Sequence, residues 1–195
     1  IAFVLSSWPI GYIAAALIAR AVLPEYGWRV LFLSGGVALV AAAYVAWFVP
    51  ESQEWQAERA RRANSAAERV RIAEIFAPGS RRNTLLGTLA ASCALTGYWG
   101  ANTWLPTYLV QERGLEPARM ATFVIALNVG MFVGYQLFGA LADRIGRRRA
   151  LMACFGGATV LLPLYALVRD PQLLFWLGPL LGVFFAYAGP FGAYF

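Results

Sequence analysis

The sequence predicts an all-α fold, namely a polytopic membrane bundle with six transmembrane helices. Of its 195 residues, 60% are hydrophobic and only 13% are charged, whereas a soluble domain carries about 25% charged residues. Six long apolar stretches follow one another along the chain. The short alternating segments typical of a membrane β-barrel do not occur. Helices are favoured because a helix satisfies its own backbone hydrogen bonds in lipid.

Each apolar stretch is long enough for one membrane crossing, which requires about 20 helical residues for a hydrocarbon core of about 30 Å. The stretches cover residues 1–23, 28–49, 84–110, 118–142, 150–168 and 173–195. Arg20 is the one charged residue well inside a stretch, and its long side chain can reach the interface by snorkelling. The chain begins at Ile1 and ends within an apolar run, so we expect it to be a section of a longer protein.

The basic residues predict the orientation of the helices. The chain has no Lys, and its 16 Arg against 10 acidic residues give a net charge of +6. Eleven Arg lie in the connections 50–83 and 143–149, and five lie on the other side. Arginine-rich connections stay in the cytoplasm, so we place both in the cytoplasm of a bacterium, beside its inner membrane and its anionic lipid headgroups. No nucleic-acid partner is expected, since these charges form no basic face with interleaved aromatic residues.

The connections on the outer side are short and contain Pro or Gly, at residues 24–27, 111–117 and 169–172. Tight turns of this kind predict that the helices they join pack as antiparallel neighbours. The cytoplasmic connection 50–83 is long, polar and rich in Arg. We expect short interfacial helices over 54–62 and 66–76, with a solvated linker as the alternative.

A glycine- and arginine-rich turn joins the fourth and fifth stretches. Gly139 permits close helix approach, Asp143 ends the span with a carboxylate at the water boundary, and Gly146 allows a sharp turn. Arg144 and Arg147, followed by two more Arg, remain in the cytoplasm. Taken alone, the turn also fits a simple positive-inside anchor.

This turn resembles the cytoplasmic signature of the major facilitator superfamily, Gly-x-x-x-Asp-Arg-x-Gly-Arg-Arg, which recurs in weaker form between helices eight and nine. The residues Pro50, Glu51 and Ser52 begin a string, Pro-Glu-Ser-Gln-Glu-Trp, that resembles the element after helix six of sugar porters and organic-acid symporters. In this chain Gln53 replaces the second proline that is usual in that element, so the match is partial.

The resemblance covers essentially the whole chain and implies helices five to ten of a twelve-helix transporter. Residues 1–49 would then be the last two helices of the N-terminal half, 50–83 the linker between halves, and 84–195 the first four helices of the C-terminal half. It also implies that Gly139, Asp143, Arg144, Gly146 and Arg147 form a conformational latch. In that latch Asp143 faces the positive end of the first helix, near Ile1, and the contact breaks when the halves rock.

Polar side chains inside the apolar stretches predict a solute cavity, because such residues are costly in lipid unless they face a cavity or a partner. Tyr98 and Asn102 lie four residues apart on one face. Asn128 and Gln136 lie on one stripe of the fourth stretch, and Tyr187 belongs to an aromatic series in the sixth. We predict that these five face the substrate, since helices seven, eight and ten contribute to the central cavity of the family. The alternatives are interhelical hydrogen bonds for the amides and core packing or an interfacial belt for the tyrosines.

Two Gly-x-x-x-Gly pairs, 130–134 and 178–182, predict close helix contacts within one chain, and we expect a monomer. An enzyme is not expected, because the sequence has no His, no paired intramembrane acids and no phosphate loop. We predict no metal and no cofactor, and we interpret Cys93 and Cys154 as small buried hydrophobic residues.

The resemblance implies a secondary active transporter for a small organic solute. An organic acid moved by proton symport with alternating access fits best, since residues 104–109, Trp-Leu-Pro-Thr-Tyr-Leu, also resemble the outer end of helix seven in organic-acid symporters. Sugar and drug transporters of the superfamily are the alternatives, and a channel or a structural membrane bundle is less favoured than these. No Asp or Glu lies in the middle of a stretch, so a proton-coupling acid is expected outside this chain.

Overall fold

A computed structural model describes residues 2–64 and 72–188, and the regular structure over these residues is entirely helical. This confirms the predicted all-α class. The elements are α1 (Ala2–Leu5), α2 (Ser7–Ser34), α3 (Val37–Phe48), α4 (Gln53–Asn64), the 3-10 helix η1 (Ile72–Phe76), α5 (Arg81–Gln111), α6 (Pro117–Ile145), α7 (Arg147–Leu167), α8 (Pro171–Phe185) and the 3-10 helix η2 (Ala186–Ala188).

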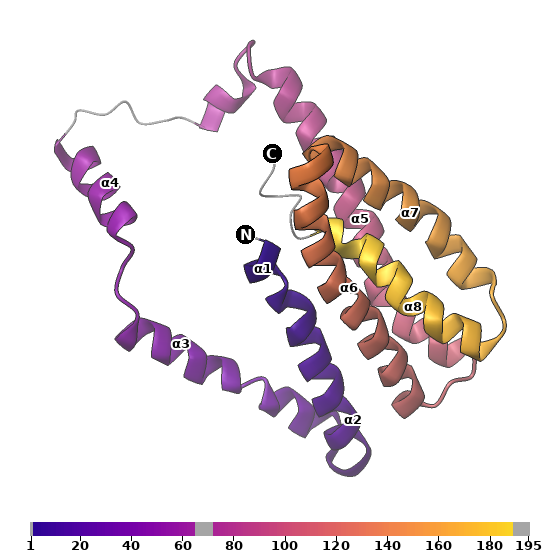
Figure 1. The fold of residues 1–195 in the computed structure, drawn as a ribbon. Helices are drawn as coiled ribbons and strands as arrows, with labels where there is room; N and C mark the ends of the chain where they lie inside the picture. Colours follow the sequence, from indigo (N-terminus) through magenta and orange to yellow (C-terminus); the bar gives the residue numbers. More distant parts are fainter. Residues whose placement is uncertain (1, 65–71, 189–195) are drawn as a thin grey trace.

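The central helix of the bundle is α6. It contacts α1, α2, α5, α7 and α8, and Figure 1 shows it between α2 and α8. Leu127, Met131 and Phe138 of this helix are almost fully buried. A helix with neighbours on several sides needs apolar residues around most of its circumference, which the sequence of α6 provides.

Glycines allow α6 and α8 to cross closely. A methyl group added at Gly130 would meet the backbone of Pro179, and one added at Gly182 would meet the backbone carbonyl of Leu127. Gly178, which also belongs to these pairs, is less closely packed, because a carbon added there would lie 3.9 Å from the backbone of Leu127, an ordinary van der Waals distance. The structure therefore confirms that the two Gly-x-x-x-Gly pairs mark a close helix contact, which holds by backbone packing.

The helix ends follow the turn residues of the sequence. Pro117 and Pro171 begin α6 and α8, where a proline suits the first helical position. Asp170 caps α8, since its side chain accepts a hydrogen bond from the backbone N–H of Gln172 at 2.9 Å. Gly146 separates α6 from α7 with a φ of +88°, which confirms the sharp turn predicted there.

The C-terminal ends of α5 and α7 are joined by a brace that consists of Tyr108, Arg113 and Ala166. The Tyr108 hydroxyl donates to the backbone carbonyl of Ala166 at 2.8 Å, and the Arg113 guanidinium donates to the same carbonyl and to the Tyr108 hydroxyl. The carbonyls in the last turn of a helix have no partner within it. The brace therefore satisfies one of them and places a cation at the negative end of α7.

The first two predicted stretches differ most from expectation. The first helix continues to Tyr26 before the chain turns at Gly27, which has a φ of +74°. The second stretch is broken at Gly35 and Gly36, and α3 follows. This helix lies away from the bundle in Figure 1 and has no buried residue, so the predicted packing of residues 28–49 on 1–23 is wrong for α3. Two adjacent glycines weaken a helix, and α3 is apolar on every side, so no single face directs it to the bundle.

The linker and the last stretch are confirmed in part. The helix predicted over 54–62 is α4. In the second predicted linker helix, residues 66–71 lie outside the described residues, and Ile72–Phe76 form a 3-10 helix. Among the described residues of the last stretch, α8 ends at Phe185 and the 3-10 helix η2 follows. Residues 189–195 lie outside the described residues.

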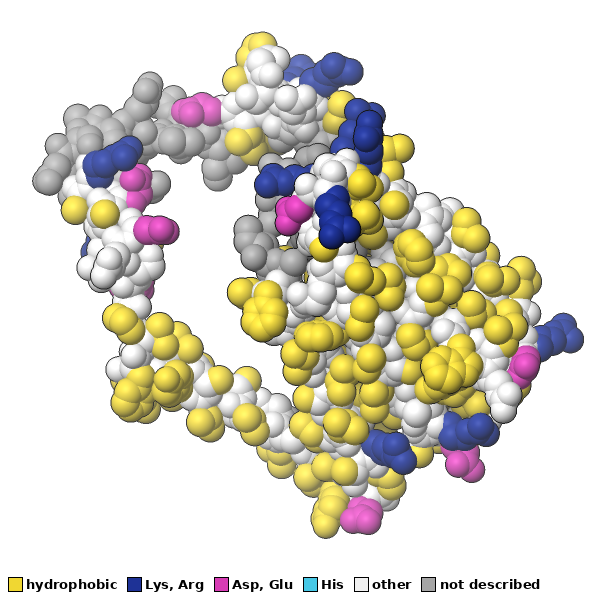
Figure 2. Space-filling view, viewed as in Figure 1, with side chains coloured by type: hydrophobic (Ala, Val, Ile, Leu, Met, Phe, Trp, Pro, Cys, Tyr) yellow, Lys and Arg dark blue, Asp and Glu magenta, His cyan; other side chains and the backbone are white. Residues whose placement is uncertain are grey.

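Within residues 2–64 and 72–188, three segments are long and apolar enough to cross a membrane, namely Phe3–Phe48, Pro117–Ile145 and Arg147–Leu167. The apolar helix α8 has 15 residues, or about 22 Å at 1.5 Å per residue. With 31 residues, α5 is long enough to cross a membrane, but its several Thr, Asn and Gly residues make it less apolar than these three segments. Figure 2 shows hydrophobic side chains over much of the visible face, with charged groups gathered toward the ends of the bundle. The number of six crossings stays a prediction.

Candidate functional site

A cavity of about 360 Å³ lies where α1, α2, α5 and α6 meet. We call it the aromatic cavity, and it is lined by Val4, Leu5, Ser7, Trp8, Leu95, Tyr98, Trp99 and Tyr135. Its size is within the range of small-molecule sites, about 300–1,000 Å³. A mostly apolar wall with a few hydroxyl and N–H groups is also typical of such sites.

Tyr98 connects three of the helices around this cavity. Its side chain is only 3% exposed. Its hydroxyl oxygen accepts a hydrogen bond from the indole N–H of Trp8 at 3.1 Å and lies 3.9 Å from the sulfur of Met131. The Tyr98 ring also makes edge-on contacts with Trp99 and Phe185, at centroid distances of 5.6 and 6.0 Å. One polar side chain of α5 thus contacts both α2 and α6.

Sequence reasoning did not select Trp8. A tryptophan near the end of an apolar helix is typical of the membrane interface, so its position gave no distinct signal. Its spacing of four residues from Tyr12 places both rings on one helix face, and their centroids lie 6.2 Å apart. That pair marks the face, but the partner Tyr98 is 90 residues further along the chain, so only the packing of the helices reveals the bond.

The two asparagines predicted to face the substrate make hydrogen bonds within their own helices. The Asn102 amide donates to the backbone carbonyl of Tyr98 at 3.2 Å, and the Asn128 amide donates to that of Val124 at 2.8 Å. Asn128 is buried, with 1% exposure. Bonds to the carbonyl four residues earlier satisfy an amide locally, and this geometry does not direct these donors toward the aromatic cavity.

Gln136 has a buried amide nitrogen with no hydrogen-bond partner among the residues that the structure describes. It follows Tyr135, which lines the aromatic cavity, but Gln136 itself is not among the lining residues. Its side chain as a whole is half-buried.

Tyr187 lines a second cavity, of about 390 Å³, between α5, α7 and α8. Its hydroxyl donates to the backbone carbonyl of Ala94 at 3.3 Å, and its ring lies 4.5 Å from that of Phe155. Cys93 and Thr159 also line this cavity. The predicted substrate-facing residues are therefore not gathered in one place: Tyr98 and Tyr187 line different cavities.

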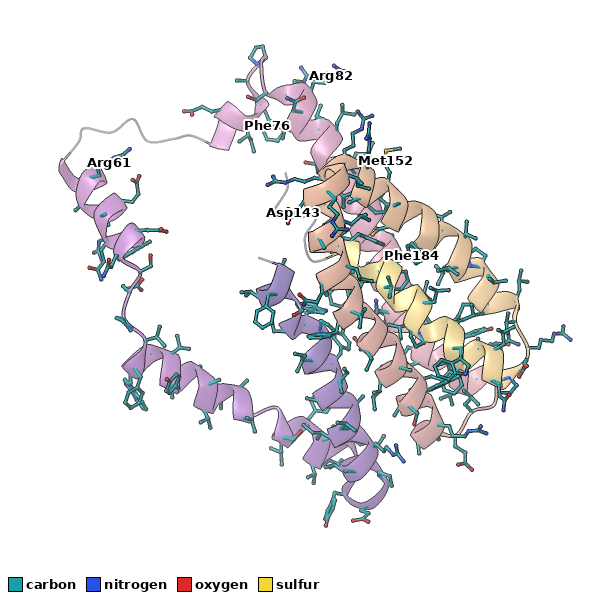
Figure 3. All side chains as sticks on the ribbon, viewed as in Figure 1. Arg61, Phe76, Arg82, Asp143, Met152 and Phe184 are labelled. Carbon is teal, nitrogen blue, oxygen red and sulfur yellow. The ribbon has the colours of Figure 1, made fainter. Side chains whose placement is uncertain are left out.

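The residues of the predicted latch lie at the end of α6 and the start of α7. Figure 3 places Asp143 at the same end of the bundle as Arg82. The helix α6 continues for two residues past Asp143, to Ile145, before the turn. Asp143, Arg144 and Arg147 are exposed, and Gly139 is half-buried. The expected partner near Ile1 lies outside the described residues, although α1 does contact α6.

Pro50, Glu51 and Ser52 form the junction between α3 and α4. The Ser52 hydroxyl accepts a hydrogen bond from the backbone N–H of Trp55 at 3.2 Å, and the Gln56 amide donates to the carbonyl of Glu51 at 3.3 Å. Ser52 is therefore an N-cap for α4. This gives the predicted linker motif a local structural role.

The chemistry that the aromatic cavity offers is binding. Ring faces and edges contact planar or apolar groups, and hydroxyl and indole groups donate hydrogen bonds to an oxygen acceptor. Across residues 2–64 and 72–188, no three His, Cys, Asp or Glu residues form a group that could hold a metal ion.

Comparisons with known proteins give a consistent result. The family model of the Major Facilitator Superfamily matches residues 1–195. The cis,cis-muconate transport protein of Acinetobacter baylyi is 32% identical over 191 residues, which cover 96% of this chain and 46% of that protein. The gentisate transporter of Corynebacterium glutamicum is 29% identical over 81% of this chain and 36% of its own length. The sialic acid transporter of Escherichia coli is 26% identical over 77% of this chain and 36% of its own length.

The chain thus spans less than half the length of these curated relatives. No solved structure matches it. The family match covers every residue, and it agrees with the multi-pass helical architecture and with the turn at Gly146. The chain belongs to the Major Facilitator Superfamily.

Proposed function

We propose that the complete protein moves a small organic acid across the bacterial cytoplasmic membrane by proton symport, with alternating access. The observation that carries this proposal is the aromatic cavity, in which ring surfaces and hydrogen-bond donors meet between α2, α5 and α6. A flat, unsaturated acid needs both features. The names of several relatives, transporters of muconate, gentisate and benzoate, support the same class of solute.

The cavity also lies at a place that suits alternating access. By the proposed division of the chain, α2 belongs to the N-terminal half and α5 and α6 belong to the C-terminal half. A solute held between the halves can be exposed to either side as they rock. The latch of Asp143 and its neighbouring Arg residues would stabilise one of the two states at the cytoplasmic surface. Arginine-rich connections would also contact anionic lipid headgroups there.

An uptake experiment tests this function directly. Cells or proteoliposomes that contain the product of the complete gene are given radiolabelled benzoate, gentisate or cis,cis-muconate, with and without an inward proton gradient. We expect saturable uptake of at least one acid, and we expect a protonophore to abolish accumulation against a gradient. Saturable uptake of glucose or of a cationic drug, with none of the three acids transported, would contradict the proposal and favour another branch of the superfamily.

A further inference from the structure

The hydroxyl of Tyr98 donates its proton to a weak acceptor. An indole N–H can only donate, so the bond between Trp8 and Tyr98 uses the hydroxyl oxygen as acceptor. The proton of the hydroxyl is donated to the thioether sulfur of Met131, 3.9 Å away. A thioether is a weak acceptor, so a stronger acceptor in the cavity could take its place. A strong acceptor is the missing element of this arrangement.

The surroundings of this hydroxyl point to a ligand as that acceptor. Tyr98 is 3% exposed and yet lines the aromatic cavity, so its side chain meets the cavity rather than open solvent. Buried hydroxyl groups are nearly always hydrogen-bonded. A carboxylate that enters the cavity would supply an ionised oxygen, and O–H···O⁻ bonds are shorter and about twice as strong as neutral ones.

We propose that the Tyr98 hydroxyl donates a hydrogen bond to the carboxylate of the solute, and that Trp8 is the positioning residue that holds this hydroxyl in place. The proposal rests on the proposed function, because it assumes that an organic acid occupies the aromatic cavity. It adds the group that recognises the acid end and the way in which that group is oriented.

Trp8 is suited to this role by its packing. Its ring lies edge-on to Trp99, with centroids 6.1 Å apart and planes at 76°, and it is tilted against Tyr12. These contacts fix the indole on α2 so that its N–H points at Tyr98 on α5. A hydroxyl that accepts one hydrogen bond becomes a better donor for the next, and the second bond is strengthened by about 10–30%. Trp8 therefore both orients the donor and strengthens it.

The arrangement predicts a preference for a carboxylate over the matching carboxamide. Both groups can accept a hydrogen bond, but only the carboxylate carries the charge that the bond stabilises. Removal of the Tyr98 hydroxyl should therefore weaken the binding of the acid more than that of its amide. Removal of the Trp8 N–H should act in the same direction and to a smaller extent, because the hydroxyl itself remains.

The test compares benzoate with benzamide, or nicotinate with nicotinamide, in the full-length protein in membrane vesicles. The pair is chosen by which acid the wild type takes up. Half-saturation is measured for the acid, and inhibition is measured for the amide. We expect Tyr98→Phe to lower the acid-to-amide preference by about tenfold, as loss of a hydrogen bond to a charged group should do. Trp8→Phe should lower it by about threefold on the same scale.

Two further variants separate positioning from general damage. In the double variant Trp8→Phe/Tyr98→Phe, the loss of preference should equal that of Tyr98→Phe alone, because Trp8 acts through the hydroxyl. Leu95→Ala changes the cavity wall but keeps both donors, and it should change the acid and the amide equally. Size-exclusion profiles in detergent identify any variant that fails to fold, and Tyr98→Phe then remains the deciding variant because it removes a single oxygen atom.

The outcomes are distinct. Uptake of an acid by the wild type with an unchanged preference in Tyr98→Phe would overturn this inference and leave the proposed function in place. Additive losses in the double variant would overturn the role of Trp8. A wild-type protein that takes up no acid would refute the proposed function itself, and this inference with it.

Discussion

At the scale of single residues, Tyr98 and the glycines of α6 and α8 illustrate two different demands on a membrane-buried position. Tyr98 is a polar side chain that must find hydrogen bonds, and it meets partners from two other helices. The glycines carry no side chain, and they matter because a neighbouring backbone occupies the space where a side chain would be.

Gly130→Ala should destabilise the protein. The added methyl group would collide with the backbone of Pro179, which cannot rotate away as a side chain can. Overpacking of this kind costs about 1–3 kcal/mol, so the apparent melting temperature of the purified protein should fall. Gly156→Ala is the matched control on α7, because an added carbon there meets nothing within 4 Å. It should leave the melting temperature unchanged or raise it slightly, by the helix preference of Ala over Gly. Equal effects of the two substitutions would contradict the close contact.

The residues that sequence reasoning found were those whose signal is local. Gly146 lies in a turn and has the positive φ that favours Gly, and the Gly-x-x-x-Gly pairs show their spacing directly. The polar residues were harder, because the choice between a cavity and a local partner depends on packing. Asn102 and Asn128 bond to carbonyls four residues earlier. Trp8 was missed because its partner is distant in sequence.

At the scale of elements, the brace between α5 and α7 shows how the C-terminal ends of two helices are joined. Arg113 and Tyr108 come from the end of α5 and the loop after it, and they converge on one carbonyl near the end of α7. The Arg113 guanidinium also lies over the Tyr108 ring, 5.1 Å from its centroid. The three interactions support one another, so loss of Arg113 should loosen both helix ends.

Arg113→Ala should lower the stability of the purified protein by about 1 kcal/mol. The hydrogen bonds are charge-assisted, but the side chain is only half-buried, so their contribution is below that of fully buried ones. The readout is thermal unfolding in detergent. Arg119→Ala, at the exposed first turn of α6, is the matched control, since a cation at the positive end of a helix gives no stabilisation. A loss of stability that is the same for both variants would show that the brace contributes nothing.

The elements themselves were largely predictable, because apolar stretches bounded by Pro and Gly define α5, α6 and α7 closely. The exception is the segment from Trp28 to Val49. Its composition predicts one continuous helix, yet the structure breaks it at Gly35 and Gly36 and leaves α3 without buried residues. A uniformly apolar sequence does not encode a packing direction, so the position of α3 could not be derived from its residues.

At the scale of the whole molecule, the proposed division of the chain places the aromatic cavity between the two halves. The Trp8–Tyr98 bond joins α2 to α5 across the proposed boundary between them. Because this bond requires α2 to lie beside α5, the oriented donor exists only while the halves are close on that side. A solute that binds better in one state shifts the population toward it.

Asp143→Asn should shift the balance between the two states of the transport cycle by about two- to fivefold. An anion near a helix N-terminus stabilises the state that contains this contact by about 0.3–1 kcal/mol, and the substitution removes that stabilisation. The measurement is the rate at which a single introduced cysteine on the cytoplasmic side is labelled, in a background without Cys93 and Cys154. Asp170→Asn is the matched control at the opposite end, where the Asn can still cap α8. Labelling and transport that do not change in Asp143→Asn would contradict the latch.

The central claim is that the apolar helices cross a membrane with the arginine-rich turns in the cytoplasm, and cysteine labelling in intact cells tests it most directly. The variants Arg148→Cys and Glu116→Cys, in the same cysteine-free background, place one probe in the turn between α6 and α7 and one just before α6. We expect a membrane-impermeant maleimide to label the probe at 116 in intact cells and the probe at 148 only after the cells are permeabilised. Labelling of the probe at 148 from outside, with the probe at 116 protected, would contradict the central claim.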